Sequence, residues 1–392
     1  MRVYRIQGKQ SLTFQFVMEN IYVSSSLFVI LCIATFTIQL ANATVPAVYI
    51  FGDSIVDVGT NTYIPGSTAR ANFPFNGVDF AHSRPTGRFS NGLNSADFLA
   101  KLMGFKRSPQ PYLFLVSLQS SLKRRKHRGA NFASGGAGLL DTTNEARCPI
   151  WSNQQKVVSL TKQIQQFFRV YNNRVAVLGS DATKKMLSKS LFFVSVGSND
   201  IFVYFSTNNT MPPALYITHL MHQYEAYIKV MSELQTLYNF GARKFGIIGV
   251  PPIGCCPARR VYNATGGCLE GMNDFARAFH FALDTLMRKI SSELPEMKYS
   301  LGNTHELIIN VIQNPSHFNL KDVETACCGA GRLNAEIPCN VTSNLCVNRK
   351  EYLFWDMCHP TQTASQLVAV TLYDGPPRFV TPINFHQLAD DN

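Results

Sequence analysis

Apolar stretches alternate with amphipathic ones along most of the chain. Five short apolar runs have the length and composition of buried strands, and they lie at 45–51, 129–133, 190–196, 244–250 and 298–301. Longer runs with helical periodicity lie at 154–171, 215–240 and 273–294, and we expect the last two to end at Gly241 and before Pro295. Strands separated by helices predict an α/β fold with a mostly parallel sheet of about five strands, covered by helices on both faces.

The N-terminal residues have the pattern of a secretory signal. Ser26–Leu40 is apolar but shorter than a membrane span, and the small residues Ala41-Asn42-Ala43 follow it. We therefore predict that residues 1–43 are a signal peptide, with Met18 as an alternative start, and that 44–392 form a single domain. A retained membrane anchor would need a longer apolar run. The pattern predicts a secreted, extracellular protein of the apoplast or cell wall, without an integral membrane anchor.

Composition and charge narrow the class of protein. Of the 392 residues, 46% are hydrophobic and only 16% are charged, which suits a folded chain rather than a disordered one. The net charge is +11, and removal of residues 1–43, which carry +2, leaves +9. Such a surface favours acidic surroundings: an acidic cell-wall polymer, an anionic membrane or nucleic acid. Because the chain is predicted to be exported, the basic run Lys123–Arg128 is interpreted as a solvated connection that contacts acidic polymer, and no nucleic acid partner is expected.

Cysteine usage agrees with export. Nine cysteines remain after the signal, and their clustering predicts local disulfides within Cys255–Cys268 and within Cys327–Cys346, with at least one thiol left over. A zinc site is less favoured, because neither adjacent pair has the two-residue gap of zinc-ribbon ligands. Acceptor triplets for N-glycosylation begin at Asn208, Asn263 and Asn340.

Polar or glycine-rich turns follow the first three predicted strands. Ser54 stands in "FGDSIVDVG", Gly135 in "NFASGGAG" and Asn199 in "VGSND", and ligands of open α/β sheets bind where strands end. A serine needs a base to become a nucleophile, and His359 in "FWDMCHP" has Asp356 three residues before it to orient the ring. By themselves, these segments could equally be ordinary turns with a capping aspartate.

Taken together, the motifs resemble the GDSL, or SGNH, hydrolases. "RPTGRFSNG" at 84–92, "GVPPIGCCPARR" at 249–260 and "CCGAG" at 327–331 add a resemblance to the secreted plant GDSL esterase/lipases, in the expected order along nearly the whole mature chain. The resemblance implies a three-layer α/β/α sandwich. It also implies Ser54 as nucleophile, His359 as general base and acid, Asp356 beside it, and an oxyanion hole from Ser54, Gly135 and Asn199.

Some residues depart from the usual plant pattern. Thr60, Ile201 and Cys358 replace residues common in the family, and each is expected to shape the acyl pocket. The nearby acids Asp53, Asp57 and Asp200 are interpreted as turn formers and hydrogen-bond acceptors.

The function predicted from these observations is secreted hydrolysis of small-molecule or lipid carboxylic esters through an acyl-enzyme on Ser54, with no metal or organic cofactor. One alternative uses the same acyl-enzyme to transfer the acyl group to an alcohol. The other alternative, which is less favoured, is a non-enzymatic wall or defence protein that keeps the fold.

Overall fold

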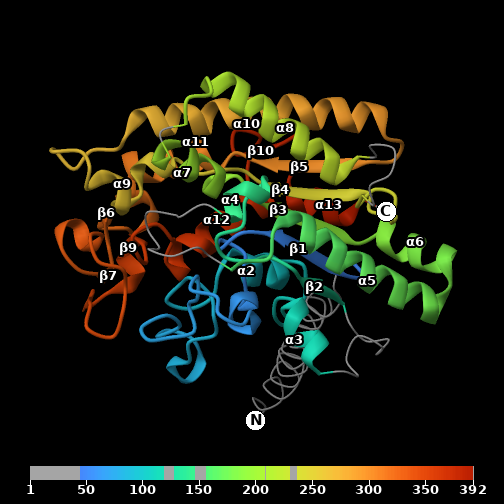
Figure 1. Ribbon diagram of the computed structural model, residues 1–392, viewed down its shortest axis with the longest axis horizontal. Coiled ribbons are helices and arrows are strands. Elements are labelled where there is room, and N and C mark those ends of the chain that lie inside the picture. The colour runs from blue at the N-terminus through green and yellow to red at the C-terminus, as the bar shows by residue number, and fades with distance from the viewer. Residues whose placement is uncertain (1–44, 119–127, 146–155, 208, 230–235, 392) are drawn as a thin grey trace, which may run out of the picture. The chain divides into compact units, whose positions relative to one another are not determined.

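The computed structural model describes residues 45–118, 128–145, 156–207, 209–229 and 236–391 (Figure 1). The predicted signal peptide with its cleavage site, most of the basic run Lys123–Arg128, Cys148 and the acceptor Asn208 lie outside the described residues. None of the described helices combines the length and apolarity needed to cross a membrane.

A six-stranded sheet forms the centre of the described chain. Its strands are β1 (Val48–Gly52), β2 (Gly129–Asn131), β3 (Leu191–Ser195), β4 (Lys244–Ile248), β5 (Lys298–Gly302) and β10 (Val380–Thr381). Their order is β10-β5-β4-β3-β1-β2, with β1 to β5 parallel and β10 antiparallel to β5. The mostly parallel α/β sheet is confirmed, and all five predicted strands are present. The sixth, β10, was not predicted, because two residues are too few to show a hydrophobic period.

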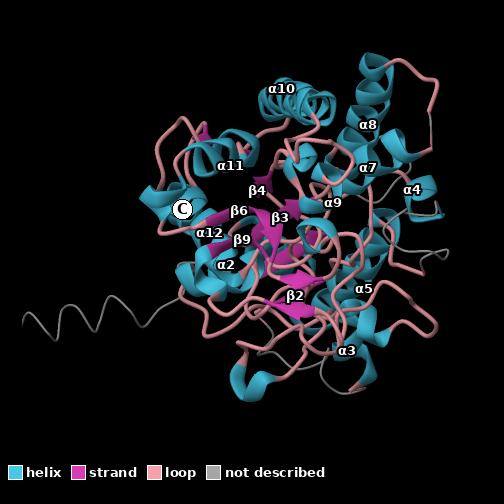
Figure 2. Cartoon of the chain, turned by 90° about the vertical axis from the view of Figure 1, so that its left-hand side faces the viewer, coloured by secondary structure: helices cyan, strands magenta, loops and turns pink. Residues whose placement is uncertain are grey.

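Helices cover both faces of this sheet. The larger ones are α5 (Leu160–Leu178), α8 (Pro213–Ile228), α10 (Glu270–Glu293), α11 (Thr304–Gln313) and α12 (Gln362–Asp374). The shorter ones are α2 (Ser95–Leu102), α3 (Tyr112–Ser117), α4 (Asp141–Glu145), α6 (Ser180–Ser188), α7 (Ser198–Ser206), α9 (Pro257–Arg260) and α13 (Phe385–Asp390). Figure 2 shows α2 and α12 on one side of the strands and α5 and α8 on the other. The three-layer α/β/α arrangement is therefore confirmed.

The core between the sheet and α5 is aromatic. Phe167 of α5 is fully buried, and its ring meets those of Tyr49 and Phe192 edge-on at 5.0 and 5.5 Å. Such pairs add to the free energy gained by burying the rings. This packing anchors α5 beneath β1, whose end carries the candidate nucleophile.

Two predicted helices have wrong boundaries. The run 154–171 corresponds to α5, which begins at Leu160 and continues past the predicted end to Leu178. The run 215–240 was expected to be helical to Gly241, but α8 ends at Ile228 and Lys229 already has extended backbone. Gly241 instead closes a turn, in which its N–H donates to the Tyr238 carbonyl at 2.9 Å. The apolar period continues past Ile228 because Leu237 and Phe240 are buried from this turn, and burial alone does not distinguish a turn from a helix.

Two small sheets of two strands each lie near the C-terminus, and disulfides crosslink this segment. Strands β6 (Asp322–Ala326) and β9 (Tyr352–Phe354) pair in parallel, and β7 (Cys328–Gly329) pairs antiparallel with β8 (Asn344–Leu345). The disulfides Cys255–Cys268, Cys327–Cys346 and Cys328–Cys339 confirm the predicted local bridges. The N–H groups of Cys327 and Cys328 donate to the carbonyls of Phe354 and Trp355. The crosslinked segment therefore supports the chain just before Asp356.

Candidate active site

Ser54 lies in a tight turn at the end of β1. The glycine before the turn, Gly52, has φ 140°, and a Cβ there would lie 2.0 Å from the Ser195 carbonyl oxygen of β3, so only glycine fits. Asp53 closes the turn: its carbonyl accepts the N–H groups of Val56 and Asp57, and its carboxylate accepts that of Ile55 at 3.1 Å. The geometry lifts the Ser54 side chain out of the sheet at its carboxyl edge.

A buried glutamine holds the strand end in place from behind. The Gln163 side chain accepts the Gly52 N–H at 2.8 Å and donates to the Gly52 carbonyl at 2.9 Å. Gln163 belongs to α5 and is fully buried. The Gly52 carbonyl also accepts the Ser134 N–H at 3.0 Å, so both backbone groups of Gly52 are paired at the point where the chain leaves the strand.

His359 and Asp356 come from the turn that follows β9, about 300 residues further along the chain. His359 Nε2 lies 2.8 Å from Ser54 Oγ, and Nδ1 lies 2.9 and 2.8 Å from the two Asp356 oxygens. Asp356 also accepts the N–H groups of Cys358 and His359 at 3.0 and 2.8 Å, which closes the turn. Since Nδ1 donates to the carboxylate, Nε2 is left as the acceptor for the serine hydroxyl. The structure thus brings together the three residues predicted as a triad.

Burial strengthens this charge pair. Asp356 and His359 are only 8% and 5% exposed. Burial by itself raises the pKa of the Asp356 carboxyl, but the facing His359 and the hydrogen bonds from the turn outweigh it, so that the pKa lies below its usual range. Asp356 is therefore ionised wherever His359 is able to act as a base.

Asn199 and Gly135 line the same pocket as Ser54 and His359. Asn199 lies in the first turn of α7, and its amide donates one N–H to the Ala137 carbonyl at 2.9 Å. This bond fixes the orientation of the amide and leaves its second N–H available. Within the described chain the Ser54 N–H has no hydrogen-bond acceptor. These two N–H groups are therefore candidate donors to an oxyanion in this pocket.

Gly135 differs from the prediction. Its N–H, expected to face the oxyanion, donates to the Asp57 carboxylate at 3.0 Å. Asp57 is fully buried and accepts two further N–H groups, from Gly59 and Thr60, so the Gly135 amide completes its set of partners. Gly136, the next residue, also lines the pocket. The sequence motif placed the right loop at the site but could not specify where each amide points.

A glycine is nevertheless required at position 135 for packing. A Cβ there would lie 2.4 Å from the ring of Phe89. Phe89 is 5% exposed, and its ring lies 4.9 Å from the imidazole of His359 between centroids. Phe89 was not singled out from the sequence, although it stands in the "RPTGRFSNG" motif. The Phe89 ring therefore packs between His359 and the loop that carries Gly135.

Three buried acids surround the nucleophile turn, and each serves as a hydrogen-bond acceptor, as predicted. Asp200 accepts the N–H groups of Leu139 and Leu140 and the Thr143 hydroxyl. Burial raises the pKa of Asp200, and it raises the pKa of Asp53 to about 7 and that of Asp57 to about 6.

A cavity of about 40 Å³ contains Ser54, and an apolar cavity of about 70 Å³ adjoins it. The two share five lining residues, Ile55, Ser198, Pro251, Cys256 and Cys358. Further apolar walls come from Val196, Ile248, Ile308, Leu353, Phe354 and Val368. Of the three positions that depart from the family pattern, only Cys358 lines these cavities. The expectation that Thr60 and Ile201 shape the acyl pocket was wrong, because both are buried away from it.

The only described group of side chains close enough to hold a metal ion is the triad region itself. Ligand atoms of Asp356, Cys358 and His359 lie within 4.8 Å of one another. Both Asp356 oxygens already lie within hydrogen-bond distance of His359 Nδ1, so the carboxylate is occupied by the imidazole. A metal at this position would have to displace the triad hydrogen bonds.

The remaining predicted sites lie apart from the pocket. Asn263 and Asn340 are half-buried on loops, and each accepts a hydrogen bond from the hydroxyl of the threonine two residues on. Cys256, by contrast, lines both cavities; it remains a thiol, and burial raises its pKa to about 12.

Comparison with known proteins agrees with this geometry. The GDSL-like lipase/acylhydrolase family matches residues 48–372. The chain is 38% identical to the GDSL esterase/lipase At5g55050 of Arabidopsis thaliana, over 88% of this chain and 90% of the relative. It is 34% identical to GDSL esterase/lipase 7 of the same plant, over 88% and 92%. A solved GDSL-like lipase from Parabacteroides merdae shows only weak similarity, with a TM-score of 0.32 at 10% identity over 84% and 94% of the two chains.

The chain therefore belongs to the GDSL-like lipase/acylhydrolase family. This membership makes it a serine ester hydrolase, in agreement with the function predicted from the motifs. The disulfides and the plant relatives are consistent with a secreted protein.

Proposed function

We propose that the protein is a secreted esterase in which Ser54, His359 and Asp356 form the catalytic triad. The observation that carries this proposal is the continuous chain of hydrogen bonds from Ser54 Oγ through His359 to the Asp356 carboxylate, with distances of 2.8–2.9 Å. A base within 3 Å of a serine hydroxyl, itself oriented by a buried carboxylate, is the arrangement that activates serine for acyl transfer.

The reaction follows from this geometry. His359 Nε2 takes the proton of Ser54 Oγ while the oxygen attacks the ester carbonyl. The Ser54 N–H and the second N–H of Asn199 stabilise the negative charge on the carbonyl oxygen. His359 then gives the proton to the leaving alcohol, and the acyl group stays on Ser54. Water then loses a proton to His359 and attacks the acyl-enzyme. His359 returns this proton to Ser54 Oγ as the acyl–oxygen bond breaks and the acid is released.

The adjoining apolar cavity is the proposed site for the acyl chain. It begins at Ile55, next to the nucleophile, and its walls are mostly aliphatic. Burial of each methylene against such walls contributes about 0.8 kcal/mol, so apolar acyl groups should be preferred to charged ones. The substrates we propose are carboxylic esters of small molecules or lipids.

Hydrolysis is preferred to transfer of the acyl group to an alcohol, because the relatives are esterase/lipases. The assembled triad argues against a non-enzymatic role. We further propose that the mature chain begins near Thr44, is glycosylated at one or more of its three acceptors, and acts in an extracellular wall where its basic surface meets acidic polymer.

The test compares the secreted mature protein with Ser54→Ala on aryl esters of short and medium acyl length. The wild type should hydrolyse them, and a folded Ser54→Ala should lose essentially all turnover while still binding the ester. Circular dichroism and thermal melting serve as the folding control. Full turnover by folded Ser54→Ala would refute the proposed mechanism.

A further inference from the structure

A much larger cavity lies beside the catalytic pocket and has no part in the proposed chemistry. Its volume is about 590 Å³, within the range of ligand-binding clefts. We call it the basic cleft, because Arg84, Arg88, Lys101, Lys106 and Arg107 line it, against the single acid Asp97. The walls come from the loops that follow β1, from α2, and from residues 106–114, which lead into α3.

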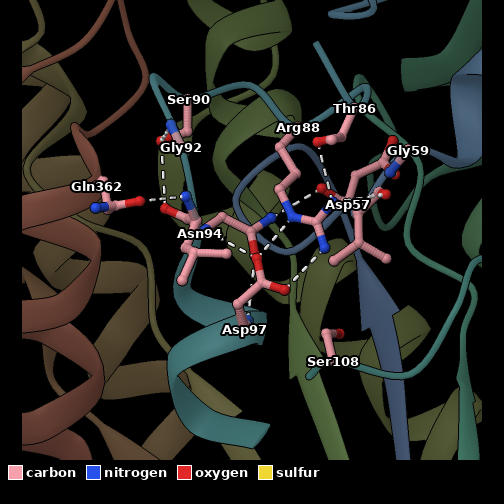
Figure 3. Close-up of polar contacts among 12 residues, drawn as sticks. Asp57, Gly59, Thr86, Arg88, Ser90, Gly92, Asn94, Asp97, Ser108 and Gln362 are labelled. Carbon is pink, nitrogen blue, oxygen red and sulfur yellow. Dashed lines mark hydrogen bonds and ion pairs between the residues drawn. The ribbon is translucent and has the colours of Figure 1, made fainter. Parts of the chain in front are cut away.

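One of the five cations is fully occupied within the protein. Arg88 forms a two-pronged ion pair with the Asp97 carboxylate at 2.6 and 2.8 Å, and it donates to the Thr86 hydroxyl at 3.0 Å (Figure 3). Asp97 is buried in the first turn of α2, where it also accepts the Asn94 N–H. This ion pair holds the cleft wall in place, and the charges of Arg88 and Asp97 neutralise each other.

The other four cations have no acidic partner in the described part of the chain. Arg84, Lys101, Lys106 and Arg107 are all exposed, and they take part in none of its ion pairs. Four uncompensated positive charges around one concavity raise the local concentration of anions. A single small anion would engage only part of this wall, whereas a chain with repeated negative charges could engage it all.

Two aromatic rings stand on the same wall. Tyr63 and Phe114 pair with ring centroids 5.6 Å apart, and Tyr63 is 42% exposed. Exposed rings beside cations offer an apolar platform for the flat faces of sugar rings, whose carboxylates the cations could then reach. The cleft thus combines the two contacts that an acidic polysaccharide needs.

We propose that the basic cleft binds a chain of uronic acid residues, such as de-esterified pectin. A flat membrane surface would leave part of a concave wall without contacts, and the predicted export argues against nucleic acid as the partner. The inference rests on the proposed secretion but not on the proposed catalysis.

Neighbouring residues line the cleft and the catalytic pocket. Arg88 lines the cleft while its neighbour Phe89 lines the pocket, where its ring rests against His359. A bound polymer would therefore hold the enzyme with its active site close to the polymer surface. Because the four unpaired cations contact none of the triad residues, polymer binding can be altered without changing hydrolysis of a small soluble ester.

The experiment measures binding of labelled oligogalacturonate to the secreted mature protein at low and high salt. Lys106→Glu combined with Arg107→Glu reverses two neighbouring charges of the cleft. The matched control is Lys184→Glu with Lys185→Glu, two neighbouring exposed cations on α6 that line none of the cavities described above. Both double variants change the net charge by the same amount. Hydrolysis of a small aryl ester and thermal melting are measured for all three proteins.

We expect the wild type to bind the acidic oligomer, to bind a fully methyl-esterified oligomer at least about tenfold more weakly, and to lose affinity as salt shortens the screening length from ~30 Å to below ~8 Å. The cleft variant should bind about tenfold or more weakly, and the control within about threefold of wild type, with aryl ester hydrolysis unchanged in both. Equal weakening by the two variants would show nonspecific charge attraction and overturn the proposal. Equal binding of the neutral oligomer, or cleft-dependent binding of anionic phospholipid vesicles without binding of oligogalacturonate, would overturn it too. Absence of hydrolysis would leave this binding result intact, so the two proposals fail separately.

Discussion

Arg88 lines the basic cleft and its neighbour Phe89 lines the catalytic pocket, yet the polar groups of the two regions are partnered in different ways. In the pocket, of about 40 Å³, Ser54, His359 and Asp356 bind one another, and the buried acids around them accept backbone N–H groups. In the cleft, of about 590 Å³, four exposed cations remain without acidic partners in the described chain.

The difference predicts how each region responds to change. Hydrogen-bonded geometry in a small buried site acts on the transition state, so that variants there should lower kcat. Unpaired charges in an open cleft act through long-range attraction, so that variants there should change polymer affinity and its salt dependence. Four changes in the pocket test this contrast.

Asp356→Asn should have the largest effect. An asparagine can still accept the N–H groups of Cys358 and His359 that close the turn, but it no longer favours the tautomer that leaves Nε2 as acceptor. We expect kcat on an aryl ester to fall by about 10³–10⁴, with an unchanged melting curve. A fall of less than tenfold in the folded variant would show that the carboxylate is only a turn former. Binding of oligogalacturonate should not change.

Asn199→Ala should come next. The Asn199 amide is proposed to act only on the charge that develops in the transition state, and loss of one such donor costs about 10²–10³ in kcat. Because the substrate in its ground state gains little from this bond, kcat and kcat/KM should fall together with KM nearly constant. A raised KM at normal kcat would instead assign Asn199 to substrate binding.

Phe89→Ala should have a moderate effect, about tenfold on kcat. The change removes the ring that holds His359 against the Gly135 loop and leaves room for the imidazole to move. Phe89→Leu should restore much of the activity, because it refills the space. If Phe89 acts by packing, Gly135→Ala should be less harmful combined with Phe89→Leu than in the wild type, where the new Cβ meets the ring. Simple additivity of the two changes would argue against this coupling.

The last change concerns stability and its pH dependence, and its effect on kcat is expected to be the smallest. Burial raises the pKa of Asp53 to about 7 and of Asp57 to about 6, so the folded protein holds these protons more tightly than the unfolded chain, whose carboxyls titrate near 3.8. Stability contributed in this way is present at low pH and is lost as pH rises toward 7, with a slope of up to about 1.4 kcal/mol per pH unit for each group. Asp356 acts in the opposite sense, since its pKa is lowered, and its contribution is lost only below pH ~4.

The protein should therefore melt at a higher temperature at pH 5 than at pH 8. Asp53→Asn, which can still accept the Ile55 N–H, should flatten that slope. A melting temperature that rises from pH 5 to pH 8 in the wild type would contradict this account.

Sequence patterns predicted the parts of the fold whose physics is local. Phe245–Ile248 lacks polar side chains because both faces of the sheet are covered, and runs of this kind predicted the central parallel strands. Strand β10 and the end of α8 were missed. The first is too short for a pattern, and the second lies where buried residues continue into a turn.

In the candidate site, too, some features were predicted from the sequence and others were not. Side chains with distinctive chemistry, such as Ser54 and His359, were predicted from motifs that recur in the family. The direction of the Gly135 amide was not, because it depends on Asp57, which is 78 residues earlier. Phe89 was missed because an aromatic residue in a loop carries no sign of the ring it will pack against. In the sequence, only the net charge indicated a basic cleft, because its cations come from separate segments that the fold brings together.

The most direct test of the central claim is covalent labelling of the mature protein with an aryl fluorophosphonate, followed by mass spectrometry of the peptides. Such reagents react with a serine activated by an adjacent base. The account predicts one stoichiometric adduct, on Ser54, that appears in step with loss of esterase activity and is formed far more slowly in His359→Ala. An adduct on another residue, or full loss of activity without modification of Ser54, would contradict the assignment of the nucleophile.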